Sequence, residues 1–371
     1  MGGADGVNPV AIDATSIPGE PTGVGRYAKE LVAAIYHLED RPPISLLTTR
    51  TSLRLFALPP RGNYENLIAA PNSRPLRLLY QERSLGSIAI KGGAKVFHGL
   101  HYQVPSARHK LRVVSTIHDL TFFDNPEWHE PAKVRYFQRA IRLAVKRSDA
   151  LIVPSHATAD RLRDHFATTP PIHVIYHGVD PLLVPEHGGD EDDGVELCSL
   201  GTIEPRKNLA RVLQAFDKVA DQHPDWRLRI IGRRGWKTSD FDDALAAMRN
   251  KGRVSIEGYL SEKELRHALR RARAMIYVSN AEGFGLPVLE ALASGLNVVT
   301  SNKSAMAEVA GAYAWLADPD DVDSIAQGIE TAALTSRSPD QIERQVQWAR
   351  SFTWERAARE TTTLYRQLLE A

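Results

Sequence analysis

The sequence has a single cysteine and no long hydrophobic run. Because Cys198 stands alone, no disulfide can form within the chain, which is typical of a protein from a reducing compartment. No apolar stretch approaches the roughly 20 residues of a membrane-spanning helix. The opening residues, MGGADGVNP, lack the basic and apolar layout of a signal peptide, and Gly6 replaces the Ser or Thr of a myristoylation signal. These absences predict a cytoplasmic protein.

The chain also lacks a strong net charge. Its formal charge is +1 and its isoelectric point is near 7.9. Together with the absence of a basic stripe interleaved with aromatic residues, this argues against binding of nucleic acid. The charge is uneven, because residues 1–185 carry 22 Lys and Arg against 16 Asp and Glu, whereas the remainder carries 24 against 29. A basic first half can face anionic lipid or an acidic acceptor, or it can be an ordinary solvated surface.

The length of 371 residues is large for one core and predicts two domains. Short apolar runs alternate with helical patterns, from Val10–Ile17 to Leu296–Ser301. This alternation predicts an α/β fold with two doubly wound, Rossmann-like domains, residues 1–186 and 195–353, facing a central cleft. The polar, acidic segment 187–194 is the predicted linker. A final amphipathic helix covers residues 354–371.

The stretch Glu282–Glu290, EGFGLPVLE, follows a buried strand at Met275–Ser279 and leads into a helix closed by Gly295. Its two glycines allow a sharp turn, and Pro287 suits the first helical turn. The free N–H groups of a helix start attract phosphate, and the two glutamates can accept hydrogen bonds from sugar hydroxyls. The alternative is an ordinary turn with two surface glutamates.

A pair of cations lies in Gly201–Asn208, GTIEPRKN, just before a predicted helix. Arg206 and Lys207 could neutralise a diphosphate, the first as a bidentate fork and the second as a point charge. A cation at a helix start opposes the helix dipole, so the pair is unfavourable there unless an anion is bound. The alternative is a basic pair on the surface.

The first half offers weaker candidates. Gly23 and Gly25 form a second glycine turn before a helix. His118 ends a predicted strand, where a histidine can hold a polar substrate group or can be purely structural. His98 and His101 are similar candidates in poorer positions, and no third ligand with suitable spacing makes them a metal site.

Several motifs are absent or unspecific. The chain has no G-x-S-x-G elbow, no phosphate-binding P-loop and no complete dinucleotide fingerprint. Cys198, inside a predicted strand, is not a plausible nucleophile. Three D-x-D matches, at residues 190–192, 240–242 and 318–320, show how unspecific that metal motif is. We therefore give each of these matches little weight as a metal site.

Taken together, the chain resembles the family 4 glycosyltransferases. The motifs that carry the resemblance span nearly the whole chain in the family's order: GVGRY (23–27), HDL (118–120), VPS (153–155), HGVD (177–180), GTIEPRKN (201–208) and EGFGLPVLE (282–290). The resemblance implies the two-domain GT-B fold and a retaining transferase that uses a nucleotide sugar, with no metal or other cofactor.

The resemblance also implies roles for the second domain. Arg206 and Lys207 would bind the donor diphosphate and stabilise the leaving group. Glu282 would contact the transferred sugar, and Glu290 would hold the ribose. Backbone N–H groups would assist at three positions: Phe284, Gly285 and Leu286.

In the first domain, the resemblance implies that Gly25 lies against the phosphates and that His118 contacts the donor sugar near the reacting carbon. The closing helix would pack back on this domain. Two cations and a helix N-terminus can stabilise the departing diphosphate, which explains why a metal is dispensable. Because no nucleophile stands out, we expect the acceptor hydroxyl to attack from the face that the nucleotide leaves.

The sequence looks most like the bacterial mannosyltransferases that use GDP-mannose, although UDP-sugar users share the same residues. The acceptor, a glycan or a lipid-linked glycan, is expected on the first domain at Leu100–Arg108 and Phe122–Pro131. The predicted basic amphipathic helix Arg74–Gly93 suits peripheral contact with a membrane, or it is ordinary surface. The alternatives are a nucleotide-sugar epimerase, a phosphorylase, and a sugar-nucleotide-binding module without turnover.

Overall fold

The computed structural model describes residues 8–17, 23–56, 58, 64–106, 110–185 and 194–371. Its contacts divide the chain into two compact units, one made of Met1–Gly178 with Thr353–Ala371 and the other of Val179–Phe352. The predicted linker 187–194 lies, except for Gly194, outside the described residues. Residues 179–185 belong to the second unit, whereas the sequence analysis assigned them to the first.

In the described part of the first unit, seven strands form one parallel sheet in the order β3-β2-β1-β4-β5-β6-β7. The central strands are buried on both faces, as their apolar runs predict. The strands are β1 (Val10–Asp13), β2 (Ile44–Thr48), β3 (Tyr64–Ile68), β4 (Val96–Gly99), β5 (Arg112–Thr116), β6 (Ala150–Val153) and β7 (Ile172–Val174).

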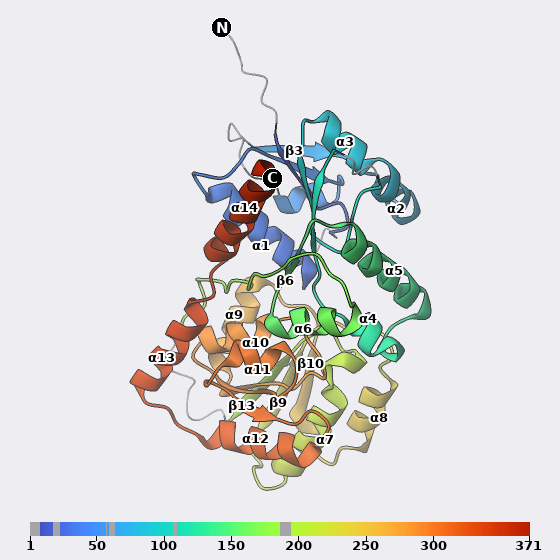
Figure 1. Ribbon diagram of the computed structural model, residues 1–371. Coiled ribbons are helices and arrows are strands. Elements are labelled where there is room, and N and C mark those ends of the chain that lie inside the picture. Colours follow the sequence, from blue (N-terminus) through green and yellow to red (C-terminus); the bar gives the residue numbers. More distant parts are fainter. Residues whose placement is uncertain (1–7, 18–22, 57, 59–63, 107–109, 186–193) are drawn as a thin grey trace. The chain divides into compact units, whose positions relative to one another are not determined.

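The C-terminal helix α14 packs against α1 within the first unit. The two helices lie side by side in Figure 1. The first unit's described helices are α1 (Val24–His37), α2 (Arg74–Arg83), α3 (Leu85–Lys91), α4 (Thr121–Asp124), α5 (Pro131–Arg147), α6 (His156–His165) and α14 (Trp354–Glu370), with short 3-10 turns η1 (Ser52–Phe56) and η2 (Pro126–Trp128).

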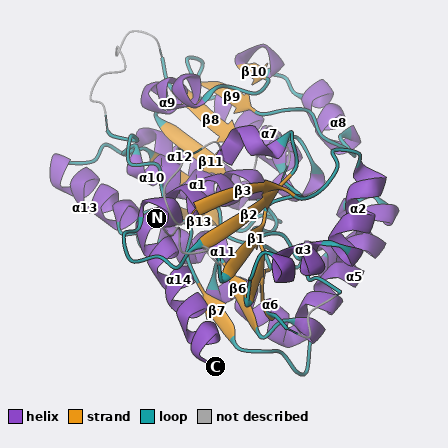
Figure 2. Cartoon of the chain, turned by 90° about the horizontal axis from the view of Figure 1, so that it is seen from above, coloured by secondary structure: helices purple, strands orange, loops and turns teal. Residues whose placement is uncertain are grey.

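The described part of the second unit holds a six-stranded parallel sheet in the order β10-β9-β8-β11-β12-β13. Its strands are β8 (Glu196–Leu200), β9 (Arg227–Ile231), β10 (Val254–Glu257), β11 (Ala274–Tyr277), β12 (Asn297–Ser301) and β13 (Trp315–Ala317). Its helices, which are labelled in Figure 2, are α7 (Leu209–Ala220), α8 (Ser239–Ala247), α9 (Glu262–Arg271), α10 (Leu286–Ala293), α11 (Ala305–Ala310), α12 (Val322–Leu334) and α13 (Pro339–Arg350). Two 3-10 turns, η4 (Pro205–Lys207) and η5 (Lys251–Arg253), also belong to this unit.

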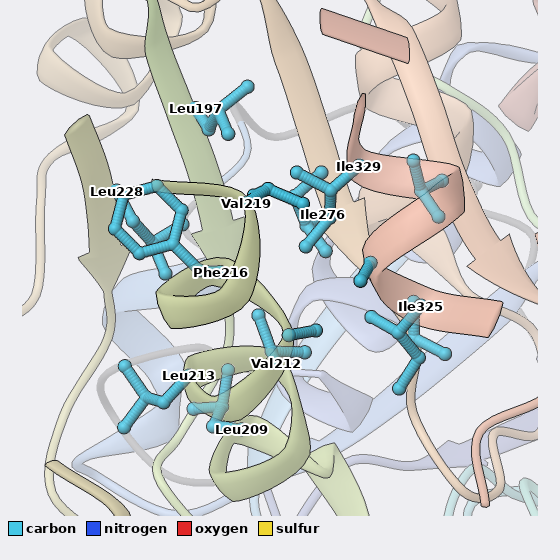
Figure 3. Packing of buried hydrophobic residues seen from close by; sticks show 14 of the residues in the cluster. Leu197, Leu209, Val212, Leu213, Phe216, Val219, Leu228, Ile276, Ile325 and Ile329 are labelled. Carbon is cyan, nitrogen blue, oxygen red and sulfur yellow. The ribbon is translucent and has the colours of Figure 1, made fainter. Parts of the chain in front are cut away.

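The core of the second unit fixes the start of α7 on the sheet. Figure 3 shows Val212 and Phe216 of α7 among the buried side chains, together with Ile276 of β11 and Ile325 of α12. These side chains are fully buried, and each contributes about 1.5 to 3 kcal/mol relative to an exposed position. The core therefore holds the turn before α7 near the carboxyl ends of β8 and β11.

The structure confirms the two Rossmann-like units and corrects some element boundaries. The helix predicted over Arg74–Gly93 is two helices, because Ser84 ends α2 and precedes α3. The edge strand β3 was not predicted, because its sequence YENLI mixes polar and apolar residues without a buried run.

Candidate active site

Lys207 lies in the turn η4, which begins five residues after the end of β8 at Leu200. The turn begins near Gly201, whose φ of +136° lies in the region that favours glycine. A Cβ at that position would lie 3.1 Å from Cε of Lys207. The glycine therefore leaves room for the lysine side chain to lie across the end of the strand.

Asn208 anchors this turn to the neighbouring strand. It adopts a left-handed conformation with φ of 58°, which asparagine tolerates better than most residues. Its Nδ2 donates to the carbonyl oxygens of Val278 at 3.1 Å and Pro319 at 2.8 Å. Because Val278 follows β11, this contact joins the ends of two adjacent strands.

The two cations converge on Glu282. Nη1 of Arg206 donates to Oε2 of Glu282 at 2.5 Å, and Nζ of Lys207 donates to Oε1 at 2.6 Å. Lys207 also donates to the hydroxyl of Tyr277 at 2.6 Å, and this hydroxyl donates to Oε1 of Glu282 at 3.0 Å. Glu204 accepts from Nε and Nη2 of Arg206 at 3.2 and 2.8 Å. We call these five residues the cation cluster; it balances two cations with two carboxylates.

The electrostatics keep Glu282 ionised. Burial alone would raise its pKa, but Arg206 and Lys207 outweigh burial and lower the pKa to about 2. Burial lowers the pKa of Lys207, and the neighbouring Glu282 opposes this shift. The prediction that the cation pair is unfavourable without a bound anion is corrected, because carboxylates of the protein itself pair with both cations.

The turn before α10 has the predicted shape. Gly285 caps the helix with a φ of 101°, and Gly295 follows its end with a φ of 76°. The hydroxyl of Ser304 accepts from the backbone N–H of Glu282 at 3.0 Å and donates to its carbonyl oxygen at 2.5 Å, which fixes the loop. Glu290 lies on α10 and is only 3% exposed.

In the first unit, the predicted glycine turn is shorter than expected. Gly23 caps α1 with a φ of 51°, and the helix already begins at Val24. Gly25 is therefore a buried residue of the first helical turn, whereas the sequence analysis placed it in the preceding loop. Thr22, the start of that predicted turn, lies outside the described residues.

His118 follows β5 and is buried, with 7% of its surface exposed. Its Nε2 lies 2.8 Å from the carbonyl oxygen of Leu100. Since a carbonyl oxygen only accepts, Nε2 must carry the hydrogen. Burial lowers the pKa of His118 to about 4, so the ring is neutral at pH 7 and Nδ1 keeps its lone pair. The ring can therefore accept a hydrogen bond.

The other histidine and D-x-D candidates are not part of the cation cluster. Burial lowers the pKa of both His98 and His101 to about 3. Of the D-x-D matches, Asp318 and Asp320 both accept from Lys303, at 3.1 and 2.6 Å, and residues 190–192 lie outside the described part. Asp242, the last residue of the match at 240–242, forms an ion pair with Arg234. Over the described ranges no three potential metal ligands gather.

The structure thus brings Arg206, Lys207 and Glu282 together, and it adds two residues that the sequence analysis missed. Tyr277 gave one signal, a polar hydroxyl at the end of an otherwise apolar strand. Glu204 gave another, a carboxylate two positions before an arginine. No helix in the described part of the chain is long and apolar enough to span a membrane.

Known proteins confirm the class. Residues 21–182 match the family model described as Glycosyltransferase Family 4, and residues 185–348 match the model of Glycosyl transferases group 1. Sucrose-phosphate synthase from Thermosynechococcus elongatus has a similar fold, with a TM-score of 0.77, 17% identity and coverage of 98% of this chain and 99% of that one. HepE from Anabaena, solved with UDP and glucose, aligns with a TM-score of 0.70 and 15% identity over 98% of this chain and all of that one. The fold and these matches define a hexosyltransferase of the GT-B fold.

Curated relatives carry more specific names. O-antigen chain mannosyltransferase B of Escherichia coli is 27% identical over 373 residues, covering 94% of this chain and 96% of the relative. The serotype-specific mannosyltransferase WbdA of Escherichia coli is 26% identical over 264 residues, which are 65% of this chain and 32% of that protein. The chain belongs to the family 4 glycosyltransferases.

Proposed function

We propose that the protein transfers mannose from GDP-mannose to a hydroxyl of a glycan or lipid-linked acceptor, with retention of configuration and without a divalent metal. The cation cluster carries this proposal. It lies at the carboxyl ends of β8 and β11, where ligands bind in open parallel sheets. The names of the curated mannosyltransferases favour mannose as the transferred sugar.

The donor diphosphate would bind to Arg206 and Lys207. A guanidinium offers paired N–H donors to phosphate oxygens, and the ammonium adds a compact charge. Both cations lie just before the N-terminus of α7, whose dipole also favours negative charge. These groups would be most strongly engaged when the bond to the sugar breaks and negative charge grows on the phosphate.

Glu282 would change partners when the donor binds. As phosphate oxygens take over the cations, its carboxylate becomes able to accept hydrogen bonds from the hydroxyls of the transferred sugar. The backbone N–H groups of Phe284, Gly285 and Leu286 would assist at the start of α10. Glu290, farther along this helix, would accept from the ribose hydroxyls.

In the first unit, Gly25 would allow close approach of the phosphates to the first turn of α1. Nδ1 of His118 would accept a hydrogen bond from a hydroxyl of the donor sugar, because Nε2 is committed to Leu100. The neutral ring suits this role, since an imidazolium has no free lone pair.

We propose that the acceptor hydroxyl attacks the anomeric carbon from the face that the diphosphate leaves. The bond from this carbon to the phosphate oxygen breaks as the bond to the acceptor oxygen forms. GDP departs with the electron pair, and its phosphate oxygen takes the proton of the acceptor hydroxyl. No protein nucleophile and no metal take part in this scheme.

The same residues would serve a UDP-sugar, and the similar fold of HepE, solved with UDP and glucose, makes this the second candidate. We place the protein in the cytoplasm, at the inner face of the membrane if its acceptor is lipid-linked. The excess of Lys and Arg in residues 1–185 supports contact with anionic headgroups or an acidic glycan.

The test is a transfer assay in excess EDTA with GDP-mannose and a panel of UDP- and ADP-sugars, using mannose oligosaccharides as acceptors. We expect a mannosylated product only from GDP-mannose, with the α configuration of the donor seen in its NMR spectrum. An inverted product, a requirement for metal or selective use of a UDP-sugar would contradict the corresponding part of the proposal.

A further inference from the structure

A continuous chain of hydrogen bonds crosses the interior of the first unit. The hydroxyl of Tyr365 lies 2.6 Å from Nδ1 of His98, and Nε2 of His98 lies 2.8 Å from Oγ1 of Thr116. The same Oγ1 lies 3.0 Å from the hydroxyl of Tyr27. These four side chains, which we call the His98 relay, come from α14, β4, β5 and α1. None of the four residues is more than 3% exposed.

The chemistry of the relay permits only concerted arrangements. Burial lowers the pKa of His98 to about 3, so its ring is neutral at pH 7 and has one N–H donor and one acceptor nitrogen. Either Tyr365 donates to Nδ1 and Nε2 donates to Thr116, or both bonds run in the opposite direction. Loss of the hydroxyl of Tyr365 or Thr116 removes a hydrogen-bond partner of the buried His98 ring, which is unfavourable.

Tyr27, at one end of the relay, contacts His118, which is proposed to face the donor. Tyr27 lies two positions after Gly25 in the first turns of α1. Its ring meets the ring of His118 edge-on at 4.9 Å between centroids and lies 4.7 Å from the ring of His177. His177 in turn stacks on Trp354 of α14 at 5.6 Å. Tyr27 is therefore held by a hydrogen bond on one side and by packed rings on the other.

We propose that His98 is a positioning residue, which ties the C-terminal helix α14 through Thr116 and Tyr27 to the first turn of α1 and to His118. This inference rests on the proposed function, because it concerns the geometry of groups that would face the donor. His98 is completely buried, so it acts through its neighbours and not by touching substrate.

The test uses Tyr365→Phe and Thr116→Val, which each remove one hydroxyl of the relay with little change of shape. We expect each variant to lower kcat about fivefold, the effect of one lost hydrogen bond, and to leave the KM for the donor within about twofold. Because both changes break the same chain of hydrogen bonds, the double variant should lose much less kcat than the product of the two single losses. Thr116→Ser, which keeps the hydroxyl, should restore kcat.

Leu364→Ala is the matched control. Leu364 is buried beside Tyr365 on the same helix, and its truncation lowers stability without removing a relay atom. All assays are run well below the melting temperature of each variant. Wild-type kcat in Tyr365→Phe, or an equal loss of kcat in Leu364→Ala, would overturn the inference. If the wild-type protein itself transfers no sugar, the proposed function fails instead.

Discussion

Replacement of Glu282 by glutamine is expected to weaken the fold, tighten the binding of GDP and reduce transfer. The substitution keeps the shape of the side chain and removes its charge. In the wild-type protein this carboxylate accepts hydrogen bonds from Arg206, Lys207 and Tyr277, and its side chain is only 10% exposed. The three expected effects follow from the loss of one negative charge among two cations.

The effect on stability depends on pH. Burial would raise the pKa of Glu282, but Arg206 and Lys207 lower it from 4.5 to about 2. A folded-state pKa below the unfolded value gives stabilisation that is complete above pH 4.5 and is lost as the pH falls toward 2. The shift corresponds to about 3 kcal/mol. We expect Glu282→Gln to lower the free energy of unfolding by about 2 to 3 kcal/mol at pH 7, and by about half as much at pH 3, where part of the stabilisation is already lost.

The substitution is expected to tighten the binding of GDP, although it lowers the stability of the fold. The variant cluster has a net charge of +1 instead of zero, so the diphosphate no longer competes with Glu282 for the two cations. We expect GDP to bind about tenfold more tightly, a gain of about 1.4 kcal/mol. Transfer should nevertheless fall by about 100-fold, because the carboxylate proposed to hold the sugar hydroxyls is gone.

The assays are urea denaturation at pH 7 and pH 3, calorimetric titration with GDP, and the transfer assay in EDTA. Glu343→Gln, at an exposed position on α13, serves as the control for loss of one negative charge and should match the wild type in all three. Weaker or unchanged binding of GDP by Glu282→Gln would refute the claim that this carboxylate occupies the diphosphate site.

Two further substitutions test other parts of the account. Gly201→Ala should cost about 1 to 3 kcal/mol of stability and weaken GDP binding, because Gly201 has a positive φ and the new Cβ would meet the side chain of Lys207. Gly252→Ala is the control. A Cβ at residue 252 would lie in open space, so this variant should be close to neutral in denaturation and calorimetry. Burial raises the pKa of Asp13 from 3.8 to about 6 despite hydrogen bonds from Thr15, so ionisation of this side chain destabilises the fold as the pH rises from 4 to above 6. Asp13→Asn should therefore stabilise the protein by up to about 2 kcal/mol at pH 8 and by little at pH 4, and equal effects at both values would contradict this account.

Much of the fold was predictable because its signals are local. The buried strands β1, β4 and β6 are short apolar runs, and their alternation with helices predicts parallel sheets. The edge strand β3 carries no such run, since it pairs on one side only. The end of the second unit, from α11 to α13, was not predicted in detail either, although α12 and α13 begin at the side-chain caps Asp321 and Ser338, so these local helix-start signals were overlooked.

The site was predictable only in part, because its contacts join distant segments. The sequence motifs indicate Arg206, Lys207 and Glu282, but they do not show that all three touch one another. That contact exists because β8 and β11 are neighbours in the sheet, although more than 70 residues separate Lys207 from Glu282. The role of Tyr277 depends on the same adjacency. Its hydroxyl at the end of an apolar strand is a local signal, but the sequence does not show that this hydroxyl contacts Lys207 and Glu282.

The most direct test of the account is whether the cation pair binds the donor diphosphate without a metal. The measurement is calorimetric titration of GDP-mannose, in excess EDTA, into the wild-type protein and Arg206→Ala/Lys207→Ala. Lys303→Ala is the control, because this exposed lysine of the same unit pairs only with the exposed aspartates Asp318 and Asp320 among its described contacts.

We expect clear binding by the wild type and by the control, and a loss of at least about 100-fold in the double variant, since two charge-assisted contacts to phosphate are removed. Binding of equal strength in the double variant would contradict the assignment of the diphosphate site. So would binding that appears in the wild type only after a divalent metal is added.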